Sequence, residues 1–508
     1  MKLIVYLFSA LLLAPLASSA ESNLTISALF ADHMVLQRDQ PVPVWGLAKS
    51  GDQVTITFAD QKKTVIADAD GKWVVKLDAL KASATGREMI VKSANASEAK
   101  IADVLVGDVW LCSGQSNMHF QMKSVEKAPQ QIARMNAPAV RFFTVKQNFG
   151  QAPLNQTVGT WKPITPTTAA ECSAVACYFG LALHQKQEVP IGLLVSSVGG
   201  TRIESWMRRE TLAATGESLT LIEKWKSVLP EEFEKIGVAY SKFQYERDFL
   251  HPKAVKVAKE QGKTAPPAPI APKQRCHDCP SALHNGMIAP LQPFAIRGAI
   301  WYQGESNAGQ PKPYEKLLPA LIADWRHVWG KELPFLFVQI APHNSIHPSF
   351  RESQHRIWQN TPHTAMVVTT DVGNANNIHP TRKQPVGERL AIAARAVAYG
   401  ETIVSSGPIF DSLKIQGNHV VISFAHVGGG LMANDSELKG FTIAGDEGKF
   451  LPANAKIEGN TVIVNSDKVS KPAVVRYNWS ISPDGNLFNR EGLPAAPFRS
   501  DQSKDASR

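Results

Sequence analysis

The pattern of apolar and polar positions changes twice along the chain. Over residues 21–102, short apolar runs alternate with turn signals, as in PVPVWGLAKSGDQVTITF, which predicts a small antiparallel β domain. Over residues 103–403, apolar runs alternate with helical patterns, which indicates βαβ units and a mostly parallel sheet with flanking helices. From residue 404 to residue 508 the β pattern returns. We therefore expect an α/β fold between two β-sandwich-like segments.

The α/β region contains six candidate strands and four candidate helices. The strands are Val104–Cys112, Val140–Val145, Ile191–Ser197, Gly298–Gln303, Phe335–Ile340 and Met366–Thr370. The helices are Ser173–Gln187, Tyr314–Trp329, Phe350–Gln359 and Gln384–Tyr399. Residues 208–285 interrupt this alternation, because a charged helical stretch there leads into the Pro-rich KTAPPAPIAPKQRC. We interpret that segment as an insertion that forms a lid or a wall.

The first twenty residues, MKLIVYLFSALLLAPLASSA, have the pattern of a secretory signal peptide. Lys2 gives the positive start, an apolar run follows, and small residues precede a cleavage site after Ala20. The apolar run is shorter than the roughly 20 residues that a membrane span needs, and no later segment is apolar for long enough to cross a bilayer. The sequence therefore predicts an exported protein, periplasmic or extracellular, with no membrane span.

Composition and charge narrow the classes of function. The chain of 508 residues is 44% hydrophobic and 19% charged, which is typical of a globular protein with a sizeable core. Its net charge of +9 comes without a basic cluster interleaved with aromatic residues, which argues against nucleic acid as a partner. Cys276 and Cys279 have metal-like spacing, but no second pair completes a zinc site, so we expect a local disulfide or free thiols and no metal. Cys172 and Cys177 are expected to be buried thiols.

Unusual polar residues follow four of the candidate strands. They are SGQSNM after the first, GGTRIESW after the third, QGESN after the fourth, and Asp371 with NNIHP after the sixth. In parallel α/β sheets, ligands bind beyond the carboxyl ends of the strands. Together the clusters contain a hydroxyl, a Gly pair, amides, a carboxylate and a His, which are the groups that acyl transfer requires.

Each cluster alone is weak evidence. A Ser hydroxyl needs a base, an imidazole has a suitable pKa, and the tetrahedral oxyanion needs pre-placed hydrogen-bond donors. The segment around Ser116 is not a G-x-S-x-G nucleophile elbow, because Met118 stands at the last Gly position. The coincidence of all four clusters at strand ends is what favours an active site over a set of polar turns.

Several motifs resemble those of a known family. GDVWLCSGQSNM, SSVGGTRIESWM, ALHNGMIAPL, IRGAIWYQGESNA and NIHPTRKQPVGERLA look like motifs of the sialate O-acetylesterase family, within the SGNH-type hydrolases. LFADHMVLQRDQPVPVWG and NLFNREGLPAAPFRSD extend the resemblance over nearly the whole mature chain. The resemblance implies an SGNH-hydrolase-like, flavodoxin-like sheet and a serine esterase that needs no cofactor.

The resemblance also implies roles for individual residues. Ser116 would be the nucleophile, and its backbone N–H would donate to the oxyanion. Gly200, or Gly199, would supply a second backbone donor. Gln303 and Asn307 compete for a side-chain donor. His379 would be the general base.

One position departs from the SGNH pattern. An Asp commonly lies three residues before the His, and this chain has Asn376 there, which carries no charge to stabilise the imidazolium. Glu305 is the preferred replacement, and Asp371 is a further candidate. The alternative for Glu305 is a structural hydrogen bond at the strand end.

The substrate prediction has a weaker basis. Arg202, Glu204 and Trp206 either bind the glycan or form a loop ion pair and a packed aromatic, and Asn376 is a further candidate for glycan binding. The family resemblance favours O-acetylated sialic acid, and acetylated plant polysaccharide such as xylan is the alternative. A non-catalytic glycan-binding protein is the alternative of another class, and Asn376 is the feature that favours it. The sequence predicts no oligomeric state.

Overall fold

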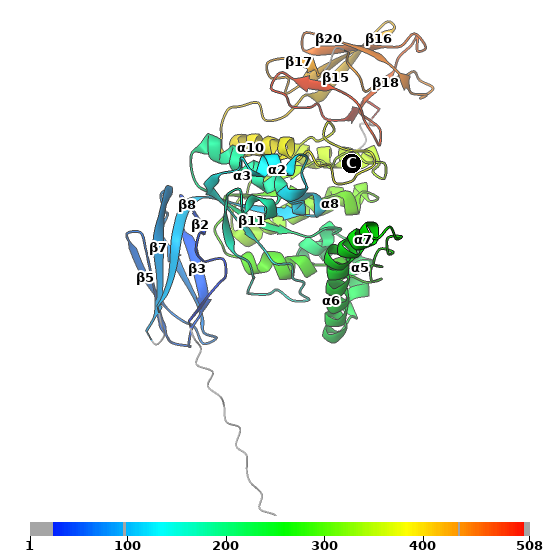
Figure 1. Ribbon diagram of the computed structural model, residues 1–508. Coiled ribbons are helices and arrows are strands. Elements are labelled where there is room, and N and C mark those ends of the chain that lie inside the picture. The colour runs from blue at the N-terminus through cyan, green and yellow to red at the C-terminus, as the bar shows by residue number, and fades with distance from the viewer. Residues whose placement is uncertain (1–23, 95–97, 435–436, 502–508) are drawn as a thin grey trace, which may run out of the picture.

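The computed structural model describes residues 24–94, 98–434 and 437–501 (Figure 1). The predicted signal peptide at residues 1–20 lies outside these residues. An α/β body carries a β unit near the N-terminus, a second β unit near the C-terminus, and a projecting group of helices (Figure 1). Within the described ranges, every helix is too short or too polar to cross a membrane.

A path of seven strands forms the sheet of the α/β body. Its order is β10-β9-β11-β8-β12-β13-β14, and all neighbours are parallel except β10 and β9. The bounds are β8 Ala99–Gly114, β9 Ala137–Thr144, β10 Trp161–Ile164, β11 Ile191–Ser197, β12 Gly298–Tyr302, β13 Phe335–Val338 and β14 Thr364–Val367. The α/β expectation is confirmed, and the sequence pattern missed the short edge strand β10.

Helices connect these strands, and the four predicted ones are all present. They are α3 Ala174–Gln187, α8 Pro311–Trp329, α9 Pro348–Asn360 and α10 Gln384–Tyr399. The Ser173 hydroxyl caps α3 by accepting the backbone N–H of Ala176. Helices α8 and α9 begin earlier than predicted, because Pro fits the first position of a helix, where its missing N–H has no partner to lose. Two short helices, α1 Ser116–His119 and α2 Ala128–Ile132, follow β8.

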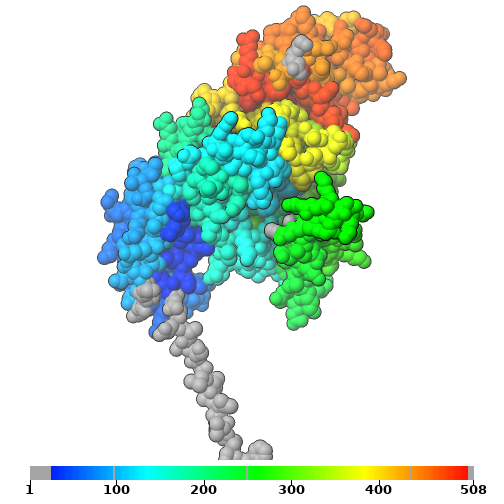
Figure 2. Space-filling view, in the orientation of Figure 1, coloured from blue at the N-terminus to red at the C-terminus, as the bar shows by residue number. Residues whose placement is uncertain are grey.

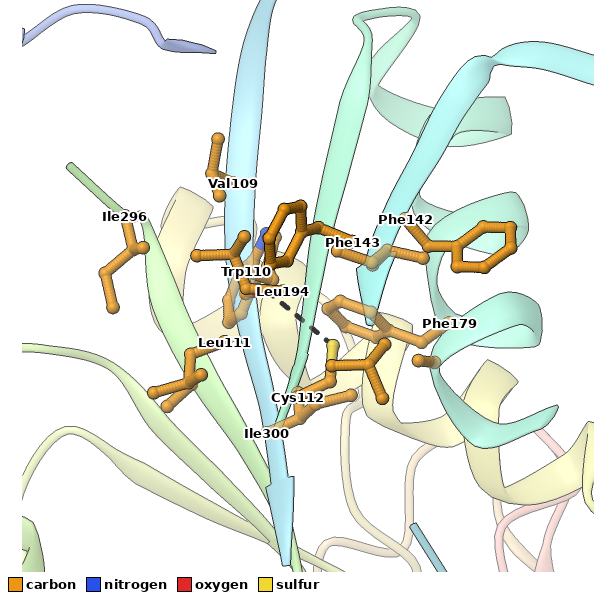
Figure 3. Packing of buried hydrophobic residues seen from close by; sticks show 14 of the residues in the cluster. Val109, Trp110, Leu111, Cys112, Phe142, Phe143, Phe179, Leu194, Ile296 and Ile300 are labelled. Carbon is orange, nitrogen blue, oxygen red and sulfur yellow. Dashed lines mark hydrogen bonds between the residues drawn. The ribbon is translucent and has the colours of Figure 1, made fainter. Parts of the chain in front are cut away.

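Helices cover both faces of the sheet. Trp110 of β8 packs against Phe179 of α3, with ring centres 5.1 Å apart (Figure 3). Trp301 of β12 packs against Trp325 of α8 at 5.7 Å. Trp301 pairs in register with Ser113, three residues beyond Trp110, and successive side chains of a strand point to opposite faces. Helices α3 and α8 therefore lie on opposite faces of a fully buried sheet.

Strand β8 belongs to two units. Its first half pairs with β2 Val35–Gln37 and β7 Ser83–Ser93, and its second half pairs with β11 and β12. The boundary predicted between residues 102 and 103 therefore falls inside one continuous strand. Near the junction, buried Asp108 accepts hydrogen bonds from Arg38 at 2.9 Å and Tyr399 at 2.8 Å, so the two units are tied together by an ion pair as well as by a shared apolar core.

The remaining N-terminal strands complete the small β unit. They are β1 Thr25–Ile26, β3 Val42–Leu47, β4 Gln53–Phe58, β5 Gln61–Ile66 and β6 Lys72–Leu77. Strands β1, β3 and β6 form one antiparallel sheet, and β4 joins β5 to β7. Strand β6 alternates exposed and buried residues, as the sequence pattern predicts for a half-buried strand.

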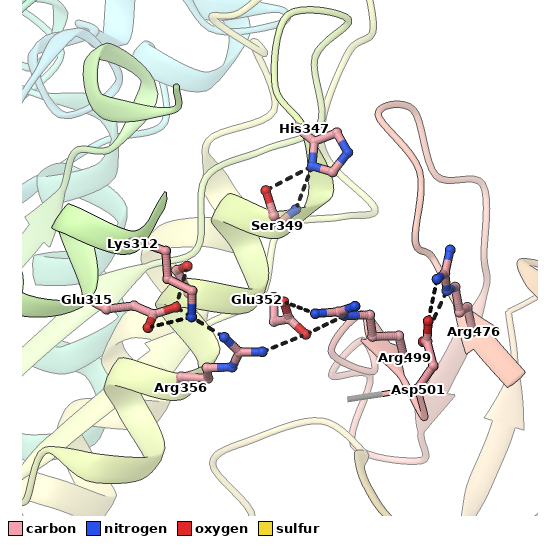
Figure 4. A network of polar contacts seen from close by, with 10 residues as sticks. Lys312, Glu315, His347, Ser349, Glu352, Arg356, Arg476, Arg499 and Asp501 are labelled. Carbon is pink, nitrogen blue, oxygen red and sulfur yellow. Dashed lines mark hydrogen bonds and ion pairs between the residues drawn. The ribbon is translucent and has the colours of Figure 1, made fainter. Parts of the chain in front are cut away.

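The C-terminal unit also consists of antiparallel strands around an apolar cluster of its own. Its strands are β15 Ile409–Gln416, β16 His419–Ala425, β17 Leu431–Ala433, β18 Phe441–Ala444, β19 Leu451–Pro452, β20 Asn454–Glu458, β21 Thr461–Asn465, β22 Val474–Tyr477, β23 Leu487–Asn489 and β24 Phe498–Arg499. Arg499 donates to Glu352 of α9 at 2.9 Å, and Arg356 approaches the same carboxylate at 3.2 Å (Figure 4). This ionic contact fastens the C-terminal unit to the α/β body.

The predicted insertion is helical and projects from the body (green in Figure 2). It contains α4 Arg209–Ala214, α5 Leu219–Lys226, α6 Pro230–Tyr245 and α7 His251–Glu260, with a π-helical turn, η4 Glu246–Leu250, between the last two. Cys276 and Cys279 lie in a small apolar cluster with Trp225 and Phe233. All five thiols are free and buried, so the free-thiol expectation holds and the disulfide expectation does not.

Candidate active site

A cavity of about 920 Å³ lies beyond the carboxyl ends of the central strands. Ser116 follows β8, Gly199 and Gly200 follow β11, Glu305 follows β12, and His379 follows β14, and all five line this cavity. Parallel strands end at the same edge of a sheet, which is why residues far apart in sequence meet there. The structure thus brings the predicted nucleophile, base, Gly pair and carboxylate into one cleft.

The turn after β8 places Ser116. Gly114 has a φ of 138°, and a Cβ on it would lie 2.2 Å from the carbonyl oxygen of Tyr302, so only glycine fits where β8 passes β12. The chain then turns at buried Gln115, whose Oε1 accepts two backbone N–H groups from the loop after β12. Ser116 begins α1, and its own N–H donates to no other residue of the described chain.

Gly199 and Gly200 line the cavity together with Ser116. A Cβ on Gly199 would lie 3.4 Å from the Cβ of Ser116, so the two residues are neighbours in the cavity. Gly200 has a φ of +74°, a conformation that favours glycine. Its N–H also donates to no residue within the described ranges. Either glycine can therefore present a backbone donor near Ser116, as the sequence analysis expects.

His379 lines the same cavity as the Gly pair. The residue is half-buried, and its backbone N–H donates to Asn377 Oδ1 at 2.9 Å. Burial, together with the charges of Lys383 and His343, lowers the pKa of His379 below its ordinary value, so its ring is neutral at neutral pH. Ser116 and His379 also line an adjoining cavity of about 230 Å³. Their side chains are not hydrogen-bonded here, and such bonds often tighten only when substrate binds.

Glu305 is held by a partner that the sequence analysis missed. Its Oε1 accepts a hydrogen bond from Asn117 Nδ2 at 2.6 Å, whereas its Oε2 is shielded from solvent and makes no hydrogen bond within the described chain. Asn117 Oδ1 in turn accepts from the buried ammonium of Lys383 at 2.5 Å. Burial raises the pKa of Glu305, and the Asn117 bond and the charge of Lys383 oppose that rise. No direct contact between Glu305 and His379 is present among the described hydrogen bonds.

The other proposed acid, Asp371, is not available to the histidine. Arg389 donates to both of its carboxylate oxygens at 2.7 Å. Asp371 does not line the cavity, so its proposed role beside His379 is corrected to that of a structural ion pair.

The two amides proposed for the oxyanion also require correction. Gln303 is fully buried, and its Nε2 donates to the carbonyl of Thr201 and to Asn307 Oδ1. Asn307 Nδ2 donates to Glu204 Oε2 at 3.0 Å, and its Oδ1 also accepts the N–H of Ile203. Neither amide lines the cavity. Both are committed to anchoring the loop that follows the Gly pair.

The residues suggested for glycan binding are placed elsewhere. Trp206 is fully buried, donates to Thr201 Oγ1 and packs against Trp301. Glu204 is buried and hydrogen-bonded. Arg202 is exposed without lining the cavity, and Asn376 is exposed and bonded to a neighbouring Asn. Trp206 is therefore the packed aromatic of the structural alternative, whereas the Glu204 carboxylate accepts hydrogen bonds from Asn307 and Ser218.

The insertion forms the outer wall of the cavity, as a lid or wall was expected to do. Its lining residues include aromatic and cationic side chains from α6, η4 and the Pro-rich loop: Tyr240, Phe243, Tyr245, Arg247 and Arg275. Arg275 binds Asp278 through Nε and Nη2 at 2.9 Å, and its Nη1 would lie 3.9 Å from a Cβ on Gly200. No periodic pattern or motif in the sequence predicts these side chains. Across the described ranges, His, Cys, Asp and Glu side chains form no cluster suited to a metal ion.

Comparisons with known proteins agree with this arrangement. A family model described as a carbohydrate esterase, sialic acid-specific acetylesterase, matches residues 106–238 and 281–396. The sialate O-acetylesterase of Rattus norvegicus is 28% identical over 97% of each chain, and that of Homo sapiens is 27% identical over 96% of this chain. The crystal structure of a carbohydrate acetylesterase from Xanthomonas citri is 36% identical, with a TM-score of 0.79 over 94% of this chain and 100% of that chain.

The matched ranges include every strand-end residue that lines the cavity. They leave out residues 239–280, from which the insertion lines the same cavity. The likeness therefore extends to the chemistry at the strand ends, but the family model does not extend to the outer wall. On these grounds the chain belongs to the sialate O-acetylesterase family of carbohydrate esterases and is a carboxylic ester hydrolase.

Proposed function

We propose that the protein is an exported serine esterase that removes O-acetyl groups from carbohydrate through an acetyl-Ser116 intermediate. The observation that carries the proposal is the meeting of Ser116, the Gly199–Gly200 pair and His379 in one cavity. The five-strand order β11-β8-β12-β13-β14 supports the flavodoxin-like, SGNH-type assignment, with β9 and β10 extending one edge.

The chemistry follows from the positions of these groups. The Ser116 hydroxyl attacks the ester carbonyl while His379 takes its proton, and the backbone N–H groups of Ser116 and Gly200 bind the oxyanion. The imidazolium then protonates the departing sugar oxygen, leaving an acetylated serine. In the second half, neutral His379 takes a proton from water, the hydroxide attacks the acetyl group, and the proton returns to Ser116 as acetate leaves.

The nucleophile has a matched control three residues away. Ser113 is fully buried in β8, and its hydroxyl does not line the cavity. Ser116→Ala should lower kcat for 4-nitrophenyl acetate by at least roughly 10³-fold with an unchanged melting temperature. Ser113→Ala should retain activity. Full activity in Ser116→Ala would overturn the proposed mechanism.

The proposed substrate is an acidic sugar, O-acetylated sialic acid. Arg247 and Arg275 line the cavity from the insertion. The guanidinium of Arg275 lies close to Gly200 and is oriented by its hydrogen bonds to Asp278. A guanidinium held in this way suits a planar carboxylate. The aromatic side chains of Tyr240 and Phe243 favour the alternative, acetylated xylan, because sugar faces pack against aromatic rings.

Acetate release from the two substrates separates these alternatives. We expect faster release from O-acetylated sialic acid, and Arg275→Ala should raise KM for that substrate about tenfold, corresponding to a lost interaction of about 1.4 kcal/mol. The same variant should hydrolyse neutral 4-nitrophenyl acetate normally. Faster release from acetylated xylan, with no effect of Arg275→Ala, would select the xylan alternative.

Export is part of the proposal and rests on residues 1–20. The mature protein recovered from the periplasm or medium should begin at Glu21, which N-terminal sequencing would detect. The non-catalytic alternative finds no support, since the nucleophile and base share a cavity and the chain is an ester hydrolase.

A further inference from the structure

Lys383 is a buried lysine beside the candidate active site. Its residue is 1% exposed, and its ammonium lies 4.9 Å from the ring centre of Phe120 and 5.4 Å from that of Tyr302. It donates to Asn117 Oδ1 at 2.5 Å. Taking a charge out of water costs several kcal/mol, so an ammonium in this place needs a compensating negative charge.

Glu305 supplies that charge through Asn117. The Asn117 amide nitrogen donates to Glu305 Oε1 at 2.6 Å and to the carbonyl of Ile378 at 3.0 Å. Ile378 precedes His379 in the chain. One amide, next to the nucleophile in sequence, therefore joins Lys383, Glu305 and the loop that carries His379.

The second carboxylate oxygen of Glu305, Oε2, is the atom that could interact with His379. Glu305 Oε2 is shielded from solvent and accepts no hydrogen bond from the described residues. Burial raises the pKa of Glu305, and the positive charge of Lys383 acts against that rise. Without a nearby cation, a carboxylate in such surroundings takes up a proton and can no longer stabilise an imidazolium.

We propose that Lys383 is the counter-charge of Glu305 and a positioning residue of the active site: it keeps the carboxylate ionised, so that Oε2 can accept an N–H of His379. The inference rests on the proposed function, because it requires His379 as the base. It also explains how the site works with Asn376 in place of an Asp. A carboxylate from the loop after β12, neutralised by a lysine at the start of α10, takes over the role of that Asp.

Other titratable groups face the pair. Burial, followed by the charge of Glu305, raises the pKa of Tyr302, and the pKa of Tyr314 is raised mainly by burial as well. Both phenols therefore stay neutral in any practical assay. Burial lowers the pKa of Lys383 to about 7 against the opposing charge of Glu305. His379 also responds to the charge of Lys383. The pH profile of the site thus depends on His379, Glu305 and Lys383.

The test compares Lys383→Met with Glu305→Gln over the pH range. In Lys383→Met, Glu305 should be protonated near neutrality and ionise at higher pH, so kcat should fall roughly 100-fold near neutral pH and recover toward the wild-type value about 1–3 pH units higher. In Glu305→Gln, kcat should stay low at every pH. The double variant should match Glu305→Gln within about threefold, because Lys383 acts through that carboxylate.

Lys331 provides the matched control. It is a half-buried lysine whose burial lowers its pKa to about 8, and it donates to the carbonyl of Ile296 at 2.6 Å, outside the cavity. Lys331→Met should keep the wild-type pH profile. If Lys383→Met does not fold, Lys383→Gln retains a donor for Asn117 without the charge and should show the same alkaline recovery.

Three results would overturn the inference. They are a loss in Lys383→Met that is equal at every pH, a double variant much slower than Glu305→Gln, and a Lys383→Met variant that behaves like wild type. An active Ser116→Ala would instead overturn the proposed function. If Ser116→Ala is inactive and Lys383→Met behaves like wild type, the proposed function is retained and the proposed role of Lys383 is rejected.

Discussion

Asn307 gives a sharp test, because the sequence motif and the structure assign it different tasks. Its residue is 1% exposed, and its amide bonds to Ile203, Gln303 and Glu204 at 3.0, 2.8 and 3.0 Å. Asn307→Leu keeps the number and branching of the side-chain heavy atoms and removes all three bonds. Each buried partner left without a hydrogen bond costs about 1–3 kcal/mol, so the free energy of unfolding should fall by at least roughly 3 kcal/mol.

Thermal unfolding and ester hydrolysis measure the two possible effects of Asn307→Leu. A change of roughly 3 kcal/mol corresponds to a melting temperature lower by roughly 6–12 °C for a domain of about 150–250 residues. The rate with 4-nitrophenyl acetate should also fall, since Ile203 and Glu204 lie in the segment that follows the Gly pair. Ser116→Ala is the control, because it should abolish activity at an unchanged melting temperature.

The opposite pattern would refute the structural reasoning for Asn307. An oxyanion donor contributes to the transition state alone, so its loss lowers kcat by about 10²–10³-fold without affecting unfolding. An unchanged melting temperature in Asn307→Leu, combined with a loss of that size, would return the amide to the oxyanion role that the motif suggested.

Three further variants or conditions test other parts of the structure. Burial and the charge of Lys383 lower the pKa of His379, so its ring stays neutral to more acidic pH. The acidic inflection in the pH profile of kcat/KM should therefore lie below pH 6.5, and an inflection above that pH would contradict this environment. Gly200→Ala should lower kcat/KM about tenfold, because a φ of +74° costs a residue with a Cβ about 1–2 kcal/mol. Wild-type kinetics in this variant would contradict the proposal that the Gly200 N–H binds the oxyanion. Arg499→Ala removes two hydrogen bonds to Glu352 and should lower the free energy of unfolding by about 1.5–3 kcal/mol. The C-terminal unit should also become more sensitive to limited proteolysis. Unchanged resistance to the protease would show that apolar contacts alone hold this unit to the α/β body.

Much of the fold was predictable because buried parallel strands are continuous apolar runs. Ile191–Ser197 and Gln384–Tyr399 have the predicted bounds, since turn residues and helical periodicity mark both ends. Strand β10 was missed because four residues with a Pro give no periodic signal. The extent of β8 was missed because a domain boundary was placed at a change of pattern, while the backbone runs straight through it.

The site was predictable only to the level of which loops take part. Strand order decides which loops meet, and the motifs identified them. The direction of each side chain depends on packing that no spacing reveals, which is why Gln303 and Asn307 were assigned to the oxyanion although both point into the protein. Lys383 lies four residues beyond His379 in the same motif, and a lysine at a helix start usually faces solvent, so its burial had no sequence signal.

The cavity is lined on one side by the strand ends and on the other by the insertion, and this division explains why catalysis and substrate choice are separable in this fold. Ser116 follows β8, and Gly200 and Glu305 follow the two strands that pair with β8 in one continuous apolar core, so the spacing of these residues changes little when the insertion changes. The insertion packs around a small apolar cluster of its own, and it meets the acyl site through Arg275 near Gly200. Substitutions in the outer wall should therefore act on KM and on the choice of sugar, whereas substitutions around Asn117 should act on kcat. A family model that covers the strand ends but not residues 239–280 thus supports the reaction more strongly than it supports any one glycan.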